Sequence, residues 1–166
     1  MIGFYSKTAD GKKVSRIFLG TAGSVYSSGG EQNALLDKMF SAGITAFDTA
    51  RVYSGAEECL GKWISSRNNR EQIFVLTKCG HPDKDWHKRV NERDIRADLD
   101  LSLKNLRIDY ADSLLLHRDD ESVPVGEIIG IFNDLKREGK ILSFGVSNWS
   151  HKRIAAANDY ARAHNL

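Results

Sequence analysis

Short apolar runs alternate with amphipathic helical patterns along nearly the whole sequence, and this alternation constrains the fold more than any other feature. Five runs are short enough for strands: 16–19, 44–48, 73–78, 110–117 and 141–146. Each precedes a segment with apolar residues three and four positions apart, as on one face of a helix: 31–42, 56–66, 91–106, 122–139 and 151–166. This order predicts an α/β fold with a parallel sheet and right-handed crossovers.

Three segments lie outside this alternation. Residues 2–15 predict a β-hairpin, because Asp10-Gly11 is a two-residue turn signal between strand-forming residues. Residues 22–30 are rich in glycine and serine but too irregular for a phosphate-binding motif, so we expect a loop on the substrate side. Residues 81–90 form a polar loop that either covers a ligand or is a solvated connector.

The placement of polar residues after strands suits two architectures. One is a barrel of the (β/α)₈ kind, and the other is an open, doubly wound sheet. No glycine fingerprint follows the first strand, which counts against an open dinucleotide-binding sheet. At 166 residues the chain fits a single domain, 1–166.

Composition and charge argue against several other classes of protein. The 24 basic and 22 acidic residues give a formal net charge of +2, which predicts neither nucleic acid nor a membrane as a partner. No apolar run approaches the roughly 18 residues of a membrane span, and residues 1–5 lack a signal-peptide pattern. Cys59 and Cys79 have no metal-ligand spacing, so we predict no metal site and reduced thiols in a cytoplasmic protein.

Four proton-bearing side chains follow three successive predicted strands. Asp48 ends the second strand and Tyr53 follows in a loop, while Lys78 and His117 end the third and fourth strands. The carboxyl ends of parallel strands share one rim, which faces the ligand. Each residue alone has an ordinary structural explanation, such as a turn cap for Asp48 or a solvated charge for Lys78. Together, in this order, they predict one site.

These residue types fit the reduction of a carbonyl group, which needs a hydride on carbon and a proton on oxygen. A free phenol, with a pKa of about 10, is a poor acid near neutrality. A lysine ammonium within a few Å favours the phenolate and so makes the phenol a better acid. Asp48 can hold Lys78 charged and in place, and His117 can donate to the carbonyl oxygen and orient it. Tyr53 is then the predicted proton donor.

The sequence resembles the aldo-keto reductases over essentially its whole length, in motifs that occur in the same order. The motifs are Phe47-Asp48-Thr49-Ala50 with Tyr53-Ser54, Thr77-Lys78, Leu115-Leu116-His117, and Gly145-Val146-Ser147-Asn148-Trp149. The hairpin also resembles the one that closes the bottom of that family's barrel. The resemblance implies a (β/α)₈ TIM-barrel fold, NADPH as the cofactor, and reversible reduction of aldehydes or ketones, as small-molecule substrates, to alcohols.

The resemblance further implies roles for individual residues. The catalytic tetrad would consist of Asp48, Tyr53, Lys78 and His117. The cofactor-binding residues would be Gly20, Thr21, Asp48, Ser147 and Asn148. Within this second set, the side chains of Ser147 and Asn148 would hold the carboxamide of the nicotinamide.

The chain is shorter than the barrel that the resemblance implies. A closed barrel takes about 250 residues, whereas the pattern here ends after five βα units and lacks strands six to eight. We therefore expect a truncated barrel with bare first and fifth strands. Bare edges favour association, so such a chain is either a truncated product or one that self-association completes.

Two other functions fit parts of the pattern. A non-catalytic regulatory or interaction module would use the fold mainly to bind a partner, as potassium-channel β subunits of the same family do. An aldolase-like barrel would use Lys78 to form a Schiff base, with Tyr53 and Asp48 assisting. That second alternative gives Ser147 and Asn148 no role, so the reductase is the hypothesis that uses every motif.

Overall fold

The computed structural model describes residues 4–9 and 11–166, so the predictions that involve residues 1–3 and Asp10 lie outside the described residues. The strands are β1 (Tyr5–Lys7), β2 (Lys13–Ser15), β3 (Phe18–Gly20), β4 (Ala46–Asp48), β5 (Phe74–Cys79), β6 (Ala111–Leu116) and β7 (Ile141–Val146). The helices are α1 (Ser24–Ser27), α2 (Asn33–Ser41), α3 (Ala56–Arg67), α4 (Glu92–Leu106), α5 (Val125–Arg137), α6 (His151–Ala163) and the 3-10 helix η1 (Arg70–Gln72). None of these helices, within the described ranges, has both the length and the apolar character needed to cross a membrane.

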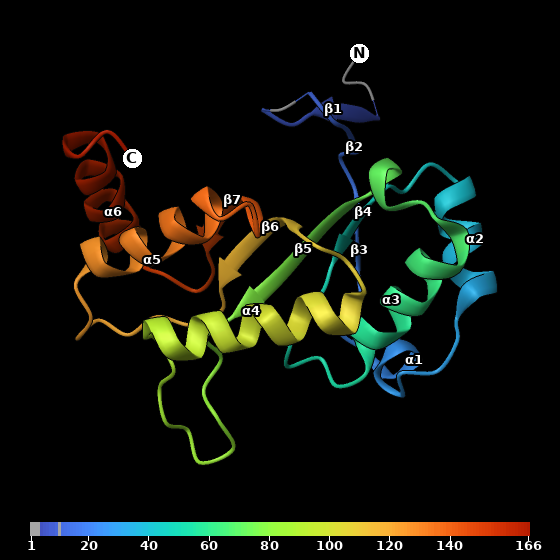
Figure 1. Cartoon of the computed structure of the whole chain (residues 1–166), viewed down its shortest axis with the longest axis horizontal. Helices are drawn as coiled ribbons and strands as arrows, with labels where there is room; N and C mark the ends of the chain where they lie inside the picture. The colour runs from blue at the N-terminus through green and yellow to red at the C-terminus, as the bar shows by residue number, and fades with distance from the viewer. Residues whose placement is uncertain (1–3, 10) are drawn as a thin grey trace.

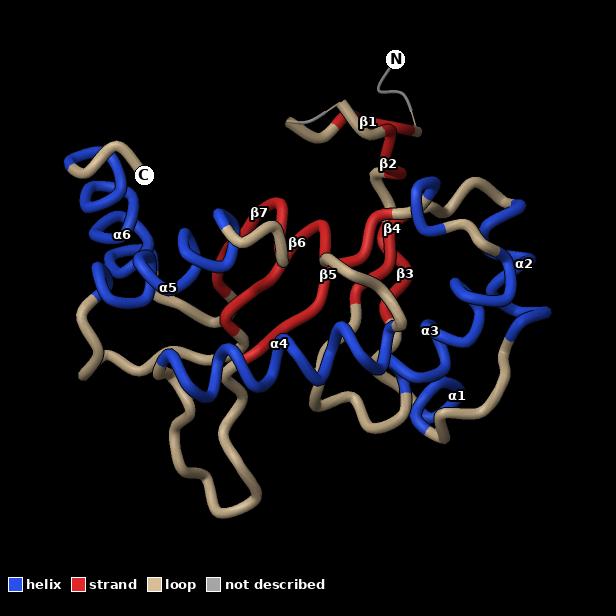
Figure 2. Tube along the Cα trace, in the orientation of Figure 1, coloured by secondary structure: helices blue, strands red, loops and turns tan. Residues whose placement is uncertain are grey.

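Strands β3 to β7 form one parallel sheet in which neighbours follow one another in chain order (Figure 1). A doubly wound sheet reverses its strand order at a switch point, whereas a barrel wall adds each strand beside the previous one. Helices α3, α4 and α5 succeed one another along the sheet as its strands do (Figure 2). The predicted α/β architecture of the (β/α)₈ type is therefore confirmed, as a wall of five strands.

Two clusters of hydrophobic side chains hold the helices against the sheet. In the first, Phe47 of β4 and Val75 of β5 pack with Trp63 of α3, and all three side chains are fully buried. In the second, Leu114 and Leu116 of β6 pack against α4 and α5. Successive side chains of a strand point to opposite faces, so the intervening residues of these strands are directed away from the helices.

The hairpin of β1 and β2 packs at the amino-terminal end of the sheet. The N–H of Ser15 donates to Thr45 Oγ1 at 2.9 Å, and Lys12 Nζ donates to Asp112 at 2.6 Å. The N–H of Thr8, after β1, donates to the carbonyl oxygen of Lys12, before β2, at 3.0 Å. This end of the sheet is opposite to the polar strand ends.

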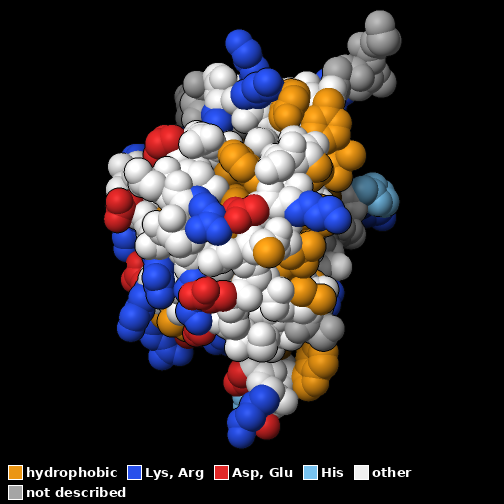
Figure 3. Space-filling view, turned by 90° about the vertical axis from the view of Figure 1, so that its right-hand side faces the viewer, with side chains coloured by type: hydrophobic (Ala, Val, Ile, Leu, Met, Phe, Trp, Pro, Cys, Tyr) orange, Lys and Arg blue, Asp and Glu red, His pale blue; other side chains and the backbone are white. Residues whose placement is uncertain are grey.

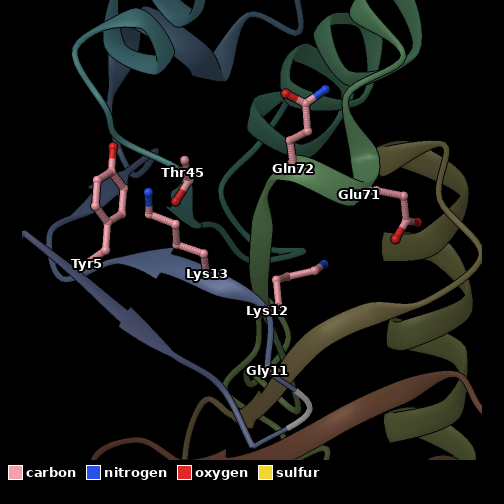
Figure 4. A pocket seen from close by; sticks show the side chains of 7 residues that line it. All are labelled: Tyr5, Gly11, Lys12, Lys13, Thr45, Glu71 and Gln72. Carbon is pink, nitrogen blue, oxygen red and sulfur yellow. The ribbon is translucent and has the colours of Figure 1, made fainter.

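A polar hollow of about 550 Å³ lies beside these contacts, between the hairpin and the residues that precede β4 and β5 (Figure 4). Its lining residues are Tyr5, Gly11, Lys12, Lys13, Thr45, Glu71 and Gln72. Two of these residues make a cation–π contact, because Lys13 Nζ lies 4.0 Å from the centroid of the Tyr5 ring. The hollow contains none of the predicted site residues, which lie at the other end of the strands.

The structure differs from the sequence-based prediction mainly at element ends and in loops. The first sheet strand begins at Phe18 rather than at Arg16, because the N–H of Arg16 donates to the carbonyl oxygen of Phe4 instead. The stretch 22–30, which we expected to be a loop, contains helix α1, and its Tyr26 is buried in the first cluster. A single turn has too few residues for helical periodicity to reveal it.

Two predicted helix boundaries are confirmed. Ser150 Oγ accepts a hydrogen bond from the N–H of Arg153 at 3.3 Å and so caps α6. Gly43 follows α2 with φ +95°, a conformation that favours glycine after a helix. The last helix ends at Ala163, however, and does not continue to Leu166 as predicted.

The outer strands of the sheet leave hydrophobic side chains exposed. Within the described residues, β3 and β7 each pair with a single neighbour. Ile17 and Phe18, at the β3 edge, are 56% and 42% exposed. Figure 3 shows hydrophobic atoms gathered along one margin of the molecule on the side it displays.

Helices α3 and α4 approach each other closely at Gly61. A Cβ atom there would lie 2.2 Å from the carbonyl oxygen of Asn105 and 2.7 Å from the carbonyl carbon of Leu106. We predict that Gly61→Ala lowers the free energy of unfolding by about 2–3 kcal/mol, because the two backbones must move apart. Urea denaturation followed by circular dichroism measures this change.

The matched control is Gly130→Ala in α5, where a Cβ would meet nothing within 4 Å. This substitution should leave the free energy of unfolding unchanged or raise it by up to about 1 kcal/mol, since alanine favours a helix over glycine. Equal destabilisation by both substitutions would contradict a close approach at Gly61.

Candidate active site

The carboxyl ends of three adjacent strands bring the four predicted catalytic side chains to one rim. Asp48 is the last residue of β4, and Lys78 is the residue before the end of β5. Tyr53 lies in the loop between β4 and α3, and His117 directly follows β6. Since β4, β5 and β6 are parallel neighbours, their carboxyl ends lie side by side.

Lys78 is at the centre of the contacts among these residues. Its side chain is 7% exposed, and Nζ donates to the carboxylate of Asp48. Nζ also donates to the carbonyl oxygen of Thr49 at 3.0 Å and to the phenol oxygen of Tyr53 at 3.2 Å. A buried charge is costly without such partners. The three oxygens therefore stabilise an ammonium group directly beside the phenol.

A compact turn holds Tyr53 above Lys78. The N–H of Tyr53 donates to the carbonyl oxygen of Ala50 at 2.9 Å, and the carbonyl oxygen of Tyr53 accepts from Ala56 at 3.0 Å. The following Gly55 packs so closely on Gly29 that a Cβ atom would lie 2.2 Å from the Gly29 nitrogen. The turn is thus fixed both to α3 and to the segment after α1.

His117 lies near two other rings. Its ring centroid is 5.8 Å from that of Tyr53 and 4.9 Å from that of His81, and both pairs meet edge to face. Its Nδ1 is buried and has no hydrogen-bond partner among the described residues. Burial lowers the pKa of His117 to about 4, and the nearby His81 and Lys78 act in the same direction. The imidazole is therefore neutral near pH 7 and can donate one hydrogen bond.

Ser147 and Asn148 lie on the same rim, directly after β7. The side-chain amide of Asn148 donates to the carbonyl oxygen of His117 at 2.9 Å and to the hydroxyl of Ser147 at 2.9 Å. Asn148 has φ +60°, a left-handed conformation that asparagine tolerates better than most residues. These bonds join the segment after β7 to His117, the residue that follows β6.

Gly20 and Thr21 lie at the other side of the rim, next to Asp48. Gly20 is level with Asp48 in the register of β3 and β4. Both the N–H and the hydroxyl of Thr21 donate to the carbonyl oxygen of Asp48, at 2.9 and 3.1 Å. Thr21 is 1% exposed, so its side chain fixes the strand end and is turned toward the backbone.

Three residues that contact this region carried no prediction of their own: Arg51, His81 and Asp98. His81 belonged only to a polar loop, and its contact with His117 joins segments that are distant in the sequence. Asp98 lies in the buried stripe of α4 together with Ile95 and Leu99. A charged residue within an apolar stripe was the signal that could have identified it.

Comparisons with known proteins find similar sequences over most of the chain. The sequence model of the Aldo/keto reductase family matches residues 16–165. Norsolorinic acid reductase from Emericella nidulans is 35% identical over 143 residues, which cover 80% of this chain and 37% of that protein. An aldo-keto reductase from Bacillus subtilis is 32% identical over 175 aligned positions, which cover 98% of this chain and 52% of that protein.

A third relative is the aryl-alcohol dehydrogenase (NADP+) of Phanerodontia chrysosporium. It is 31% identical over 141 residues, which cover 77% of this chain and 37% of that protein. Across these three comparisons, the chain spans between 37% and 52% of the length of the curated relatives.

The lowered pKa of His117 makes the stability of the protein depend on pH. Between about pH 6.5 and pH 4, the unfolded chain binds a proton at this histidine that the folded chain does not bind. The free energy of unfolding should therefore fall as the pH is lowered through this window, by about 1–2 kcal/mol after allowance for solvent screening. Urea denaturation at several pH values measures this slope.

The substitution His117→Gln removes the titrating group and should flatten the slope by that amount. The exposed His151 provides the control, because His151→Gln should leave the slope as it is in the unsubstituted protein. If His117→Gln and the unsubstituted protein lose stability equally between pH 6.5 and pH 4, burial of a neutral His117 is wrong.

Proposed function

The chain belongs to the aldo/keto reductase family, and we propose that it takes part in the NADPH-dependent reduction of aldehydes or ketones to alcohols. The observation that carries the proposal is the contact of one buried ammonium, Lys78, with both the Asp48 carboxylate and the Tyr53 phenol. The names of two relatives, a norsolorinic acid reductase and an aryl-alcohol dehydrogenase, support a carbonyl or alcohol as the substrate.

In this proposal Tyr53 gives its phenolic proton to the carbonyl oxygen of the substrate. The Lys78 ammonium, 3.2 Å from the phenol oxygen, stabilises the phenolate that remains. The Asp48 carboxylate forms an ion pair with the same ammonium and holds it in place. The neutral imidazole of His117 donates a hydrogen bond that orients the carbonyl oxygen and stabilises negative charge as it develops there.

The cofactor proposed for this reaction is NADPH, which supplies the hydride when bound. The residues at the end of β7 fit a nicotinamide carboxamide, because the Ser147 hydroxyl and the Asn148 amide offer both donors and acceptors. We also assign Gly20 and Asp48 to the cofactor site; they lie level with each other at the ends of β3 and β4. The name of the Phanerodontia relative includes NADP+, which supports this choice of cofactor.

Neither alternative function uses the contacts of Lys78 as fully. A Schiff base requires an uncharged amine, but Lys78 donates to three oxygens, as an ammonium group does. A non-catalytic interaction module, such as a protein like the potassium-channel β subunits, has no need of a phenol beside a buried ammonium. We therefore place the reductase first.

Three further proposals concern the chain as a whole. We propose that residues 1–166 form one barrel-type domain and that its uncovered strands β3 and β7 favour self-association. The exposed Ile17 and Phe18 support association at the β3 edge. The buried, free thiols of Cys59 and Cys79 support a reducing compartment, for which we propose the cytoplasm.

We predict that Tyr53→Phe lowers kcat for carbonyl reduction at least about 100-fold, because it removes the proton donor and leaves the ring in place. Binding of NADPH should be nearly unchanged. Loss of absorbance by NADPH with a panel of aldehydes and ketones measures turnover, and quenching or enhancement of its fluorescence measures binding.

The matched control is Tyr110→Phe, which removes a phenol at the opposite end of the strands, where Tyr110 contacts Glu71. Its turnover should equal that of the unsubstituted chain. Unchanged turnover in Tyr53→Phe would contradict the proposed role of Tyr53. A folded wild-type chain without turnover would contradict reduction by this chain.

A further inference from the structure

Asp98 is a buried carboxylate behind the candidate site, and it joins three segments of the chain. It lies in the middle of α4 and is 3% exposed. Its Oδ2 accepts a hydrogen bond from the backbone N–H of Gly80 at 2.9 Å. Its Oδ1 accepts from Arg89 at 2.7 Å and lies 2.7 Å from Nε of Arg51. The pair with Arg51 is an ion pair without the alignment of a hydrogen bond.

The residues that Asp98 contacts lie beside residues of the site. Gly80 directly precedes His81 and follows the end of β5, which carries Lys78. Gly80 has φ +69°, and a Cβ atom there would lie 2.6 Å from a methyl carbon of Leu116. The chain therefore turns at this point in one tightly packed conformation, and the Asp98 carboxylate holds its N–H.

Arg51 connects Asp98 to the other loop of the site, the one that carries Tyr53, as Gly80 connects it to the loop that carries His81. It lies between Asp48 and Tyr53, in the segment that leaves β4. Its backbone N–H faces the carbonyl oxygen of Lys78 at 3.4 Å, while its side chain reaches Asp98. One carboxylate thus holds both the loop that carries Tyr53 and the loop that carries His81.

These two loops supply the rings that contact His117. Tyr53 and His81 meet the His117 ring edge to face, at 5.8 and 4.9 Å between centroids. The His81 ring has its own anchor, because its Nδ1 lies 2.9 Å from the carbonyl oxygen of Pro82 and a carbonyl oxygen only accepts. Movement of either loop would therefore change the surroundings of His117.

Asp98 also closes the base of the loop formed by residues 81–88. It binds Gly80 before the loop and Arg89 after it. Between these points, residues 83–88 are exposed, and the side chain of Lys84 is 90% exposed. One buried carboxylate thus fixes both ends of this loop, by a hydrogen bond from Gly80 and an ion pair with Arg89, although most of the loop residues are exposed to solvent.

We infer that Asp98 is a positioning residue: through Gly80 and Arg51 it fixes the two loops that hold His81 and Tyr53 against His117. Its importance for catalysis rests on the proposed function, whereas its effect on the loops and rings does not. A buried carboxylate with two guanidinium groups is costly to disrupt from one side. Loss of Asp98 should therefore release both loops together.

The test uses Asp98→Asn, with Asp100→Asn as the matched control on the same helix. Asp100 forms an exposed ion pair with Lys140 at 2.8 Å and contacts no site residue. Trypsin cleavage after Lys84 reports opening of the loop. It should be about tenfold faster in Asp98→Asn, relative to the rate of global unfolding, and unchanged in Asp100→Asn.

Nuclear magnetic resonance of the imidazole C–H groups reports the ring contacts directly. The signal of His117, assigned with His117→Gln, should move in Asp98→Asn toward the position of a histidine that has no neighbouring aromatic rings. It should keep its position in Asp100→Asn. Neither this signal nor the cleavage rate requires turnover, so both remain decisive if the chain is found not to reduce carbonyl compounds.

In a chain that turns over, Asp98→Asn should lower kcat about 10- to 100-fold, because displaced groups lose their alignment with the substrate. Arg51→Gln should lower kcat in the same direction. The double variant should be no slower than Asp98→Asn, since both changes act through one contact. Multiplicative losses in the double variant would overturn the proposed route through Arg51.

Arg51→Gln and Arg89→Gln serve as further probes if Asp98→Asn does not fold, because each leaves Asp98 with two remaining partners. Either variant should speed cleavage after Lys84, and Arg51→Gln should also move the His117 signal. Unchanged cleavage and an unchanged His117 signal in the folded variants would overturn the inference, whatever the activity of the wild-type chain.

Discussion

A buried ammonium group must be surrounded by oxygen atoms, and this requirement at Lys78 organises the candidate site. Lys78 satisfies it with the Asp48 carboxylate, the Thr49 carbonyl and the Tyr53 phenol. All three oxygens come from the end of β4 and its loop, so the contact depends on β4 and β5 being parallel neighbours in register. The packing that sets the register of the strands therefore also sets the geometry of the residues at the rim.

The two faces of the strands have different roles, one in the stability of the fold and the other in the candidate site. Phe47, Val75 and Leu114 point to the helices and form the hydrophobic clusters. Along each strand, the residues that alternate with these point to the other face of the sheet. Those at the carboxyl ends of the strands, which form the rim, are polar. Asp98 adds a polar contact on the helix side, behind the rim, where it holds the loops that leave β4 and β5.

The sequence was sufficient for features that depend on local periodicity or on order along the chain. The strand 141–146, the cap at Ser150 and the gathering of Asp48, Tyr53, Lys78 and His117 on one rim are of this kind. Helix α1 was not predicted, because a helix of one turn is too short to show a periodic pattern of apolar residues. The contacts of Asp98 were missed because they join distant segments, and in the sequence it is one of several acidic residues of α4.

A fluorescence titration of the folded chain with NADPH, together with a light-scattering measurement of its mass, tests the proposed site most directly. The central claim is that the strand ends of this chain form a site for a nicotinamide and a carbonyl compound. We predict saturable binding by a species of defined mass, and weaker binding by the variant Asn148→Ala. No binding by a folded chain of defined mass would contradict the claim that these five strands suffice for a cofactor site.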